Sequence, residues 1–301
     1  MQKKRILLIG GAGTLGSDIL DANLPEYELF VIDNFSESAL AEDELELKVP
    51  YKNMSVADKQ GLIEIFQEFR PNIVFYLATT LSQNQLLAHE SNVLGVANTI
   101  EAAEHSGRPY IIYIQSFLTR NCESTITVES PVEANDSYAT WKLAGEYLLS
   151  SYSGSQTTLV LASVLSPRLS VGAIPAFIQR IQNNEPIKVT DTHRDYITPE
   201  VFISALRTLI ENESFNKIEV LGSRKPINTL EILRKTASAL RKQMDSISYE
   251  VIQPNPSDPK FISLENSLLK DRNFEDLNLD TSIGDVVRTF TGSHKNARLH
   301  H

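Results

Sequence analysis

Short runs of consecutive apolar residues alternate with segments of helical periodicity along the first half of this 301-residue chain. Continuous apolar runs are typical of parallel strands, because helices cover both faces of a parallel sheet. Strands that alternate with helices predict βαβ units, and therefore an α/β fold built on a Rossmann-type doubly wound parallel sheet. The predicted strands are residues 5–9, 29–32, 72–77, 110–114 and 158–162, and the helices between them are residues 15–23, 58–69, 86–105 and 138–151.

The composition changes after Pro167, where proline, asparagine and other polar residues become more frequent. We expect residues 1–166 to form the Rossmann domain and residues 167–290 a smaller, interleaved lobe. This lobe would pack on the carboxyl edge of the sheet, where ligands of such folds bind. Residues 291–301 are polar and lack a pattern, which predicts a disordered tail. Further helices are expected at residues 175–183, 199–212 and 229–242, and residues 187–189 and 218–220 are strand candidates of either lobe.

Charge and cysteine content exclude several classes of protein. The formal net charge is −10, whereas a protein that binds duplex nucleic acid needs a basic surface. Cys122 is the only cysteine, so no intramolecular disulfide can form, and a reducing, cytoplasmic compartment is expected. No segment approaches the roughly 20 apolar residues that a membrane span needs. No metal site is predicted.

Three glycines follow the first predicted strand in the pattern G-x-x-G-x-x-G. Residues without a Cβ let the backbone turn tightly into a helix and approach a pyrophosphate at the helix N-terminus. The alternative is a purely structural turn. Asp33 closes the second strand about 20 residues on, the spacing of an acidic residue that binds the adenosine ribose, and its charge favours NAD over NADP. The predicted cofactor contacts here are Gly10, Gly13, Thr14, Leu15, Gly16, Asp33 and Asn34.

Tyr138 and Lys142 are four residues apart on a predicted helix, so their side chains share a face. An ammonium group beside a phenol stabilises the phenolate and lowers the phenol pKa from about 10, which makes the tyrosine a usable acid or base. Ser116 follows the preceding strand, where its hydroxyl can hydrogen-bond a substrate oxygen. The alternatives are an exposed helical pair and a serine that caps a loop. Together, the three residues predict a proton-transfer site.

These motifs resemble those of the extended short-chain dehydrogenases known as NAD-dependent epimerase/dehydratases, over about residues 4–290. Residues 138–146 (YATWKLAGE) carry the resemblance most specifically. Residues 167–177 (PRLSVGAIPAF) are similar to the start of the substrate lobe in bacterial polysaccharide sugar-nucleotide epimerases. The other matching segments are residues 10–17 (GGAGTLGS), 31–35 (VIDNF), 77–78 (LA), 92–95 (NVLG) and 194–197 (RDYI).

The resemblance implies a role for each matching residue. Ser116 stands at the position of the catalytic serine or threonine, and Tyr138 at the acid/base. Lys142 stands at a lysine that also contacts the nicotinamide ribose. The residues expected to line the cofactor, mainly through their backbone, are Leu77, Ala78 and Thr79.

Two further positions take their expected roles from the resemblance. Arg194 stands where an arginine commonly grips the nucleotide diphosphate, a contact that the planar guanidinium suits. A salt bridge from Arg194 to Asp191 or Asp195 is the alternative. Asn92 is expected to be mainly structural, holding the neighbouring strand end, with organisation of the active site as the alternative.

The chain departs from the family pattern around Ser116. Gln115 replaces a serine, and Thr119-Arg120-Asn121 replaces Val-Tyr-Gly. Phe117-Leu118 stands where 4,6-dehydratases carry Asp-Glu, and neither side chain titrates, so dehydration by that mechanism is not expected.

Other departures concern ligand pockets. Val160 and Ser163 stand where an arginine and an asparagine are expected, and Ser166 replaces a glycine. Ser163 is the substrate-binding candidate at the asparagine position, and this change puts the substrate pocket in doubt more than the cofactor site. Residues 54–56 lack an aspartate that is often found near the adenine.

The resemblance implies an NAD-dependent nucleotide-sugar epimerase that inverts C4 through a transient 4-keto sugar, in bacterial surface polysaccharide or deoxysugar biosynthesis. Its substrate would be UDP- or dTDP-linked. An NAD(P)H-dependent 4-keto-sugar-nucleotide reductase and a non-catalytic NAD-binding protein are the alternatives. A homodimer is also implied, through a four-helix bundle of the helices that bear Asn92 and Tyr138, for which Leu143, Tyr147 and Leu148 offer apolar surface.

Overall fold

The computed structural model describes residues 3–80, 84–121, 123–134, 136–212, 217–255, 258–269 and 278–297. The predictions for Cys122 and for residues 298–301 lie outside these ranges. Within them, no helix combines the length and the apolar character needed to cross a membrane.

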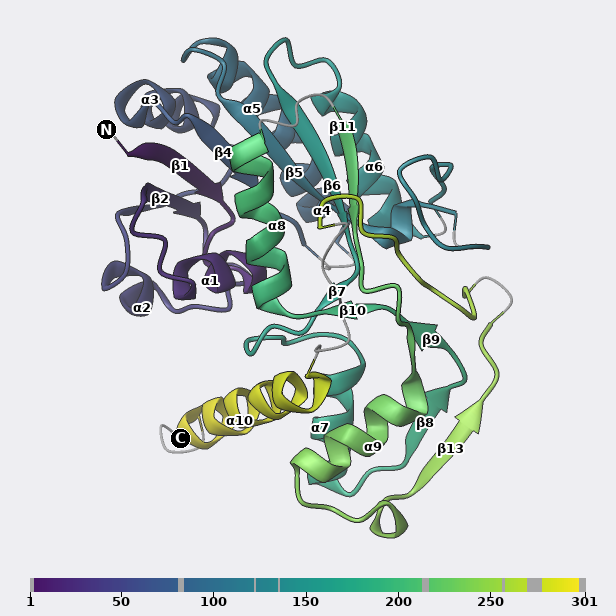
Figure 1. Cartoon of the computed structure of the whole chain (residues 1–301). Helices are drawn as coiled ribbons and strands as arrows, with labels where there is room; N and C mark the ends of the chain where they lie inside the picture. Colours follow the sequence, from purple (N-terminus) through teal and green to yellow (C-terminus); the bar gives the residue numbers. More distant parts are fainter. Residues whose placement is uncertain are drawn as a thin grey trace.

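A parallel sheet of seven strands forms the centre of the described part of the chain, in the order β11-β6-β5-β4-β1-β2-β3 (Figure 1). The Rossmann-type fold predicted from the sequence is therefore confirmed. The strand order reverses beside β1, so the loops after β1 and β4 lie at the switch point, where doubly wound sheets bind ligands. The strands are β1 Lys4–Ile9, β2 Tyr27–Asp33, β3 Tyr51–Asn53, β4 Ile73–Tyr76, β5 Tyr110–Ser116, β6 Gln156–Leu161 and β11 Lys217–Leu221.

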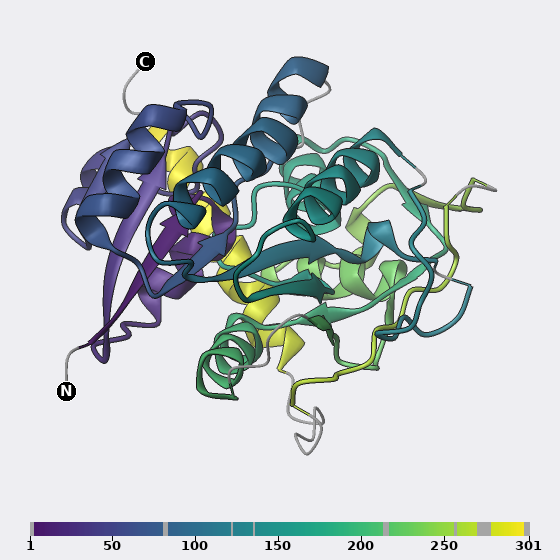
Figure 2. The same cartoon turned by 90° about the horizontal axis from the view of Figure 1, so that it is seen from above.

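Alternate residues of each central strand pack on opposite faces of the sheet. In β1, Ile6 and Leu8 enter one core, whereas Leu7 and Ile9 enter the other. Both faces of the strand are thus buried in apolar cores, which explains the continuous apolar runs in the sequence. Figure 2 shows the helices on both sides of the sheet. The first core lies under α1 (Thr14–Asp21) and α8 (Pro199–Asn212), and the second under α3 (Lys59–Phe69), α5 (Gly95–Glu104) and α6 (Ser137–Leu149).

The helix predicted at residues 86–105 is interrupted by a π-helical turn. It divides into α4 (Gln85–His89), the π turn η1 (Glu90–Leu94) and α5. The extra residue of a π turn shifts the register of the helix, and such turns are frequent at functional sites. Here the turn contains Asn92, whose side chain is fully buried and donates to the Ala88 carbonyl at 3.0 Å.

The smaller lobe lies beyond the carboxyl ends of the sheet strands (Figure 1). Its core joins Phe177, Ile232 and Val286 from three helices. The chain returns to the sheet in α8 and β11, so the lobe is interleaved in sequence with the Rossmann domain. The elements of the lobe are α7 Ala173–Asn183, α9 Thr229–Ala239, α10 Leu279–Ala297, η3 Met244–Ser246, β7 Ser163–Val164, β8 Ile187–Thr190, β9 His193–Arg194, β10 Tyr196–Ile197, β12 Ile227–Asn228 and β13 Tyr249–Ile252.

The elements that were not predicted from the sequence include the following three. The edge strand β3 is short and partly exposed, and α2 (Glu42–Glu46) is a single polar turn, so neither produces an apolar pattern. The third element, α10, extends to Ala297 and therefore covers the first part of the segment predicted to be a disordered tail. One face of this helix packs against α7 and α9 through the buried residues Ile283, Val286 and Val287. The segment is polar on average, so its composition did not indicate this apolar face.

A buried carboxyl group joins α1 to the start of the smaller lobe. Asp18 is only 4% exposed, and its Oδ1 accepts a hydrogen bond from Ser166 Oγ at 2.8 Å. Its Oδ2 has no partner among the described residues. Burial raises the pKa of Asp18 from 3.8 to about 7, because the charged form loses its hydration.

We predict that Asp18→Asn reduces the loss of stability that the wild-type protein shows as the pH rises. The pKa is raised in the folded state, so between about pH 4 and pH 7 the folded protein retains a proton that the unfolded chain has released, and the free energy of unfolding falls as pH increases. Urea unfolding at pH 5 and pH 8 should show that Asp18→Asn removes roughly 1–3 kcal/mol of this difference.

Asp21→Asn is the matched control, because Asp21 lies on the same helix and pairs with Lys48 and Arg168. Its pKa is lowered, so this variant should leave the change in stability between pH 5 and pH 8 as it is in the wild type. An unaltered pH dependence in Asp18→Asn would show that the Asp18 carboxyl is ionised throughout this range.

Candidate active site

The turn from β1 into α1 has a backbone path that only glycine accommodates. Gly10 has φ +81°, and a Cβ there would lie 2.6 Å from the Ala78 backbone. A Cβ on Gly16 would lie 2.3 Å from the Gly11 carbonyl oxygen. The helix begins at Gly13 without a side-chain cap, so the amide groups of its first turn are available to an anion. These features fit the diphosphate of a dinucleotide.

Asp33 ties the end of β2 to this turn. Its Oδ2 accepts a hydrogen bond from the Ala12 amide and its Oδ1 accepts one from the Phe35 amide, both at 2.9 Å. Burial raises the pKa of Asp33, and these backbone donors oppose the shift. Each carboxylate oxygen has a second lone pair, so the group can still accept from ribose hydroxyls. The neighbouring Asn34 uses its side-chain carbonyl within the loop, where it accepts from the Ser36 amide at 3.1 Å.

The loop after β4 connects the glycine turn with α6, the helix that bears Tyr138. Leu77 donates its amide to the Ile9 carbonyl at 2.8 Å, and Ala78 lies against Gly10. Thr79 Oγ1 donates to Asn92 Oδ1 at 3.0 Å, and the Thr79 side chain is also hydrogen-bonded to Tyr138.

This arrangement shows what the sequence reasoning missed about Thr79 and Asn92. The sequence predicted that Thr79 acts mainly through its backbone, whereas its hydroxyl bonds two side chains. Asn92 was expected to be mainly structural, and its side chain bonds Thr79 in the loop after β4 and the Ala88 carbonyl in α4. It also reaches Tyr138 through Thr79, which is the alternative role.

Tyr138 and Lys142 lie one turn apart near the start of α6. Asp136 caps this helix by accepting from the Ala139 amide at 2.6 Å, which fixes where the helix begins. Tyr138 is half-buried, whereas Lys142 is 2% exposed. The Lys142 Nζ lies 4.1 Å from the centroid of the Tyr113 ring, a cation–π contact that offsets part of the cost of burying the ammonium.

The pKa values of this pair differ from the expectation. Burial raises the pKa of Tyr138 to about 12, and the hydrogen bond with Thr79 opposes this shift. Burial also lowers the pKa of Lys142 to about 7, opposed by the Glu146 carboxylate. The predicted lowering of the tyrosine pKa by the lysine is therefore wrong for this structure, because loss of hydration dominates both groups. Tyr138 is held as a neutral acid, and Lys142 is close to its charge transition at neutral pH.

Ser116 is the last residue of β5, which extends two residues further than predicted. Its Oγ accepts a hydrogen bond from the Leu118 amide at 3.2 Å and caps the 3₁₀ turn η2 (Phe117–Thr119). This is the capping role given as the alternative. The hydroxyl proton of a capping serine can still be donated to a substrate oxygen, so capping and substrate binding are compatible.

The two substrate-binding candidates lie on short strands that belong to different two-stranded sheets of the smaller lobe. Ser163 begins β7, which pairs with β10, and its amide donates to the Asp195 carbonyl at 3.2 Å. Arg194 ends β9 and donates to the carbonyl oxygens of His193 and Pro259 at 3.0 and 2.9 Å.

The alternative partners of Arg194 are engaged elsewhere. Asp191 pairs with Lys260 at 3.4 Å. The buried Asp195 carboxylate accepts hydrogen bonds from Ser223, Arg224 and Leu264, and it therefore anchors the loops around it.

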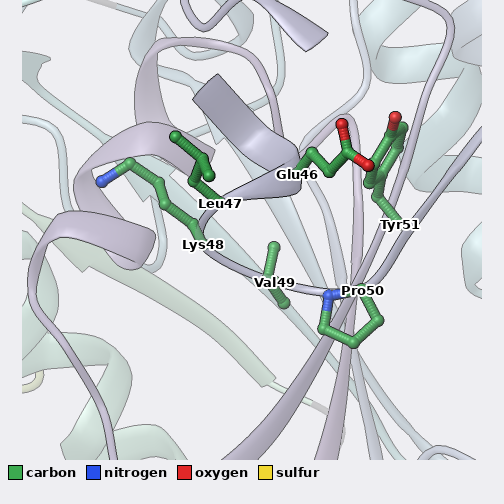
Figure 3. Close-up of a pocket in the computed structure, with 6 residues that line it drawn as sticks. All are labelled: Glu46, Leu47, Lys48, Val49, Pro50 and Tyr51. Atoms are coloured by element: carbon green, nitrogen blue, oxygen red, sulfur yellow. The ribbon is translucent and has the colours of Figure 1, made fainter. Parts of the chain in front are cut away.

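The described surface also has a hollow that lies apart from the candidate active-site residues. It lies on the turn between α2 and β3, and Figure 3 shows its six lining residues, Glu46–Tyr51. This turn leads into the amino end of β3, whereas Asp33, Thr79 and Ser116 lie at or beyond the carboxyl ends of their strands. Among the described residues, no group of histidine, cysteine, aspartate and glutamate side chains is suited to a metal ion.

The comparisons with known proteins agree with this geometry. The model of the NAD dependent epimerase/dehydratase family matches residues 6–221, so the chain belongs to this family. Curated relatives include uncharacterized epimerase/dehydratases of Staphylococcus aureus strains USA300 and NCTC 8325 / PS 47. Each is 26% identical over 162 residues, which are 50% of this chain and 48% of the relative. The chain thus spans about half the length of the curated relatives it matches.

Solved structures resemble the whole chain. The enzyme WbmG of Bordetella bronchiseptica, in complex with NAD and UDP, is 24% identical with a TM-score of 0.86, covering 97% of this chain and 96% of that one. UDP-glucose 4-epimerase of Thermus thermophilus, in complex with NAD, is 24% identical with a TM-score of 0.82, covering 96% and 99%. UDP-N-acetylglucosamine 4-epimerase of Methanobrevibacter ruminantium M1 is 20% identical with a TM-score of 0.83, covering 97% and 100%. These likenesses confirm the fold.

We predict that Gly145→Ala destabilises the protein by roughly 1–3 kcal/mol, because overpacking forces α6 away from β5. A Cβ at this position would lie 2.5 Å from Tyr113 Oη and 2.6 Å from the Asn92 carbonyl oxygen. Urea unfolding measures the change. Gly284→Ala in α10 is the control, since the nearest atom is the flexible Arg288 tip at 3.5 Å, and alanine should stabilise this helix by up to about 1 kcal/mol. Equal stability of Gly145→Ala and the wild type would contradict the close packing.

Proposed function

We propose that this chain is an NAD-dependent nucleotide-sugar 4-epimerase. The observation that carries the proposal is the contact chain from the glycine turn to the acid/base residue. Gly10 abuts Ala78, and the next residue, Thr79, is hydrogen-bonded to Tyr138. A dinucleotide on the glycine turn and a proton-transfer group would thereby share the same edge of the sheet. The NAD-bound UDP-glucose 4-epimerase among the structural neighbours supports this proposal.

The cofactor would be held by residues from three loops and from α6. Backbone amides of the glycine turn would bind the diphosphate, and Asp33 with Asn34 would receive the adenosine ribose. Leu77, Ala78 and Thr79 would line the site, and Lys142 would contact the nicotinamide ribose. The bound cofactor would supply reversible hydride transfer at the sugar carbon, so epimerisation would consume no external oxidant.

The acid and base work falls to the side chains of the chain itself. In its tyrosinate form, Tyr138 would accept the proton of the C4 hydroxyl and so become a neutral tyrosine, and it would return this proton after the keto sugar has rotated. Ser116 would donate a hydrogen bond to the same oxygen and stabilise its developing charge. Lys142, when charged, would stabilise the tyrosinate that accepts the proton. Because Lys142 is close to its charge transition, the rate should be sensitive to pH near neutrality.

The substrate in this proposal is a UDP- or dTDP-linked hexose. Arg194 on β9 would bind the diphosphate, and Ser163 on β7 would contribute a hydroxyl. The turn η2 argues against dehydration, because Phe117 and Leu118 directly follow Ser116 and neither can transfer a proton. A role in bacterial surface polysaccharide or deoxysugar biosynthesis would follow from such a substrate.

We predict that the purified protein interconverts C4 epimers of UDP- or dTDP-hexoses, detected by proton NMR, without a net change in NADH. Tyr138→Phe should lower kcat by roughly 10²–10⁴-fold with unchanged NAD content, because it removes the proton-transfer group. Tyr147→Phe is the control on the same helix, since this side chain is 61% exposed and should leave kcat unchanged.

Two results would count against the epimerase. Bound NAD without turnover of any UDP- or dTDP-hexose would exclude this substrate class. Steady consumption of NADH with a 4-keto-sugar nucleotide would instead identify a reductase.

We also propose a homodimer through α4, η1 and α6. These elements expose large apolar side chains, and α4 and η1 both contact α6. Isolated apolar residues are ordinary on a protein surface, but a cluster on adjacent helices marks an interaction site. The sequence-based residues are partly corrected, since Leu143 is buried and Leu148 packs within the monomer. The exposed set is Leu86, Leu87, Leu94 and Tyr147.

We predict that Leu86→Glu combined with Tyr147→Glu converts a wild-type dimer into a monomer, because two charges would be buried at the interface. Light scattering after size-exclusion chromatography measures the mass. Leu47→Glu is the control, since Leu47 is 89% exposed on the distant α2–β3 turn and should leave the dimer intact. A wild-type protein that is monomeric at all concentrations would refute the proposal.

A further inference from the structure

A buried ion pair connects the loop after β5 to the catalytic helix. The Arg120 side chain is 1% exposed and the Glu146 side chain 13% exposed. The guanidinium makes two bonds to the carboxylate, Nη2–Oε1 at 2.7 Å and Nη1–Oε2 at 3.2 Å. Nη1 also donates to the carbonyl and hydroxyl oxygens of Thr119, at 3.1 and 3.0 Å. This two-point geometry fixes orientation as well as distance.

Gln115 adds a second connection between the same two elements. Its Nε2 donates to Glu146 Oε2 at 2.6 Å and to the Lys142 carbonyl oxygen at 3.2 Å. Its Oε1 accepts from the Ser116 amide at 3.0 Å. The side chain is 1% exposed, so these bonds are protected from water. One residue therefore bonds the backbone of both Ser116 and Lys142.

We infer that Gln115, Arg120 and Glu146 form a positioning unit that sets Ser116 at the end of β5 against Tyr138 and Lys142 on α6. The inference rests on the proposed function for the roles of those three residues. Two of its members, Gln115 and Arg120, are the departures from the family pattern noted beside Ser116. The side chains of Gln115 and Arg120 both hydrogen-bond the Glu146 carboxylate. We therefore interpret the two departures as parts of one unit rather than as two unrelated substitutions.

The unit also sets the electrostatic surroundings of Lys142. Glu146 lies one turn further along α6 and opposes the lowering of the Lys142 pKa by burial. The ammonium also contacts the Tyr113 ring on β5, and Tyr138 precedes Lys142 by one turn of α6. Arg120 acts through Glu146, because it holds the carboxylate by two hydrogen bonds. Variants of different members can therefore separate the effect of the unit on the position of Ser116 from its effect on the charge near Lys142.

Two variants make this separation. Gln115→Leu removes the connection between Ser116 and Lys142 without changing any charge. Arg120→Met combined with Glu146→Gln removes both charges of the buried pair, so neither charge is left without a partner. Lys59→Met is the control, because it breaks the exposed ion pair with Glu101 and should change none of the measurements.

We expect both test variants to reduce kcat on the nucleotide sugar by about 10- to 100-fold, the cost of small displacements of reacting groups. KM and NAD content should stay within about threefold of the wild type, since neither variant alters a residue proposed to bind substrate or cofactor. Both proteins should be folded, as judged by cooperative urea unfolding. A folded double variant with wild-type kcat would refute the positioning role.

A titration that does not depend on turnover keeps this inference distinct from the proposed function. The Lys142 ammonium can be followed by NMR of ¹⁵N-lysine-labelled protein, with Lys142→Met to assign its signal. The double variant loses one charge of each sign, but Glu146 is the charge that raises the Lys142 pKa, so this pKa should fall in the double variant. It should stay unchanged in Gln115→Leu. If the wild type turns over no nucleotide sugar, the proposed function fails. The titration would still test whether the positioning unit controls the Lys142 pKa. An unchanged Lys142 pKa in the double variant would overturn it.

Discussion

The close packing of α6 on β5 is the contact on which the rest of the site depends. Gly145 leaves room for the Tyr113 hydroxyl and the Asn92 carbonyl, which would lie 2.5 and 2.6 Å from a Cβ. This approach buries Lys142 against the Tyr113 ring and brings Tyr138 within hydrogen-bonding reach of Thr79. A larger separation between α6 and β5 would expose the Lys142 ammonium to water and break the hydrogen bond between Tyr138 and Thr79. The depth of the active site is therefore set by one residue without a side chain.

Several charged side chains are buried where α6 packs on β5. Lys142, Arg120 and Glu146 lie within the same interface between β5 and α6, where they partly compensate one another. Such groups contribute little net stability, because the loss of hydration offsets their attraction. They do favour one arrangement of the elements over others, since any displaced charge would lose its partner. We therefore assign this network to the precision of the site rather than to the stability of the fold.

The sequence predicted the parts of the structure that depend on local pattern. Five strands and the glycine turn were recognised because apolar runs and missing side chains leave a direct trace in the sequence. The π turn around Asn92 and the hydroxyl role of Thr79 were not, because both depend on which loops meet at the sheet edge. Arg120 was read as a departure, since its partner Glu146 is distant in sequence. The lowered pKa expected for Tyr138 failed because burial cannot be read from spacing.

In the proposed reaction, one site removes a hydride from the sugar and returns it to the same carbon. The decisive measurement uses UDP- and dTDP-hexoses deuterated at C4, incubated with the purified protein and analysed by NMR and mass spectrometry. We expect the C4 epimer to form and to retain its deuterium, with no deuterium in free NADH or in the solvent. An epimer that has lost the deuterium to solvent would refute this reaction, as would deuterium that accumulates in free NADH.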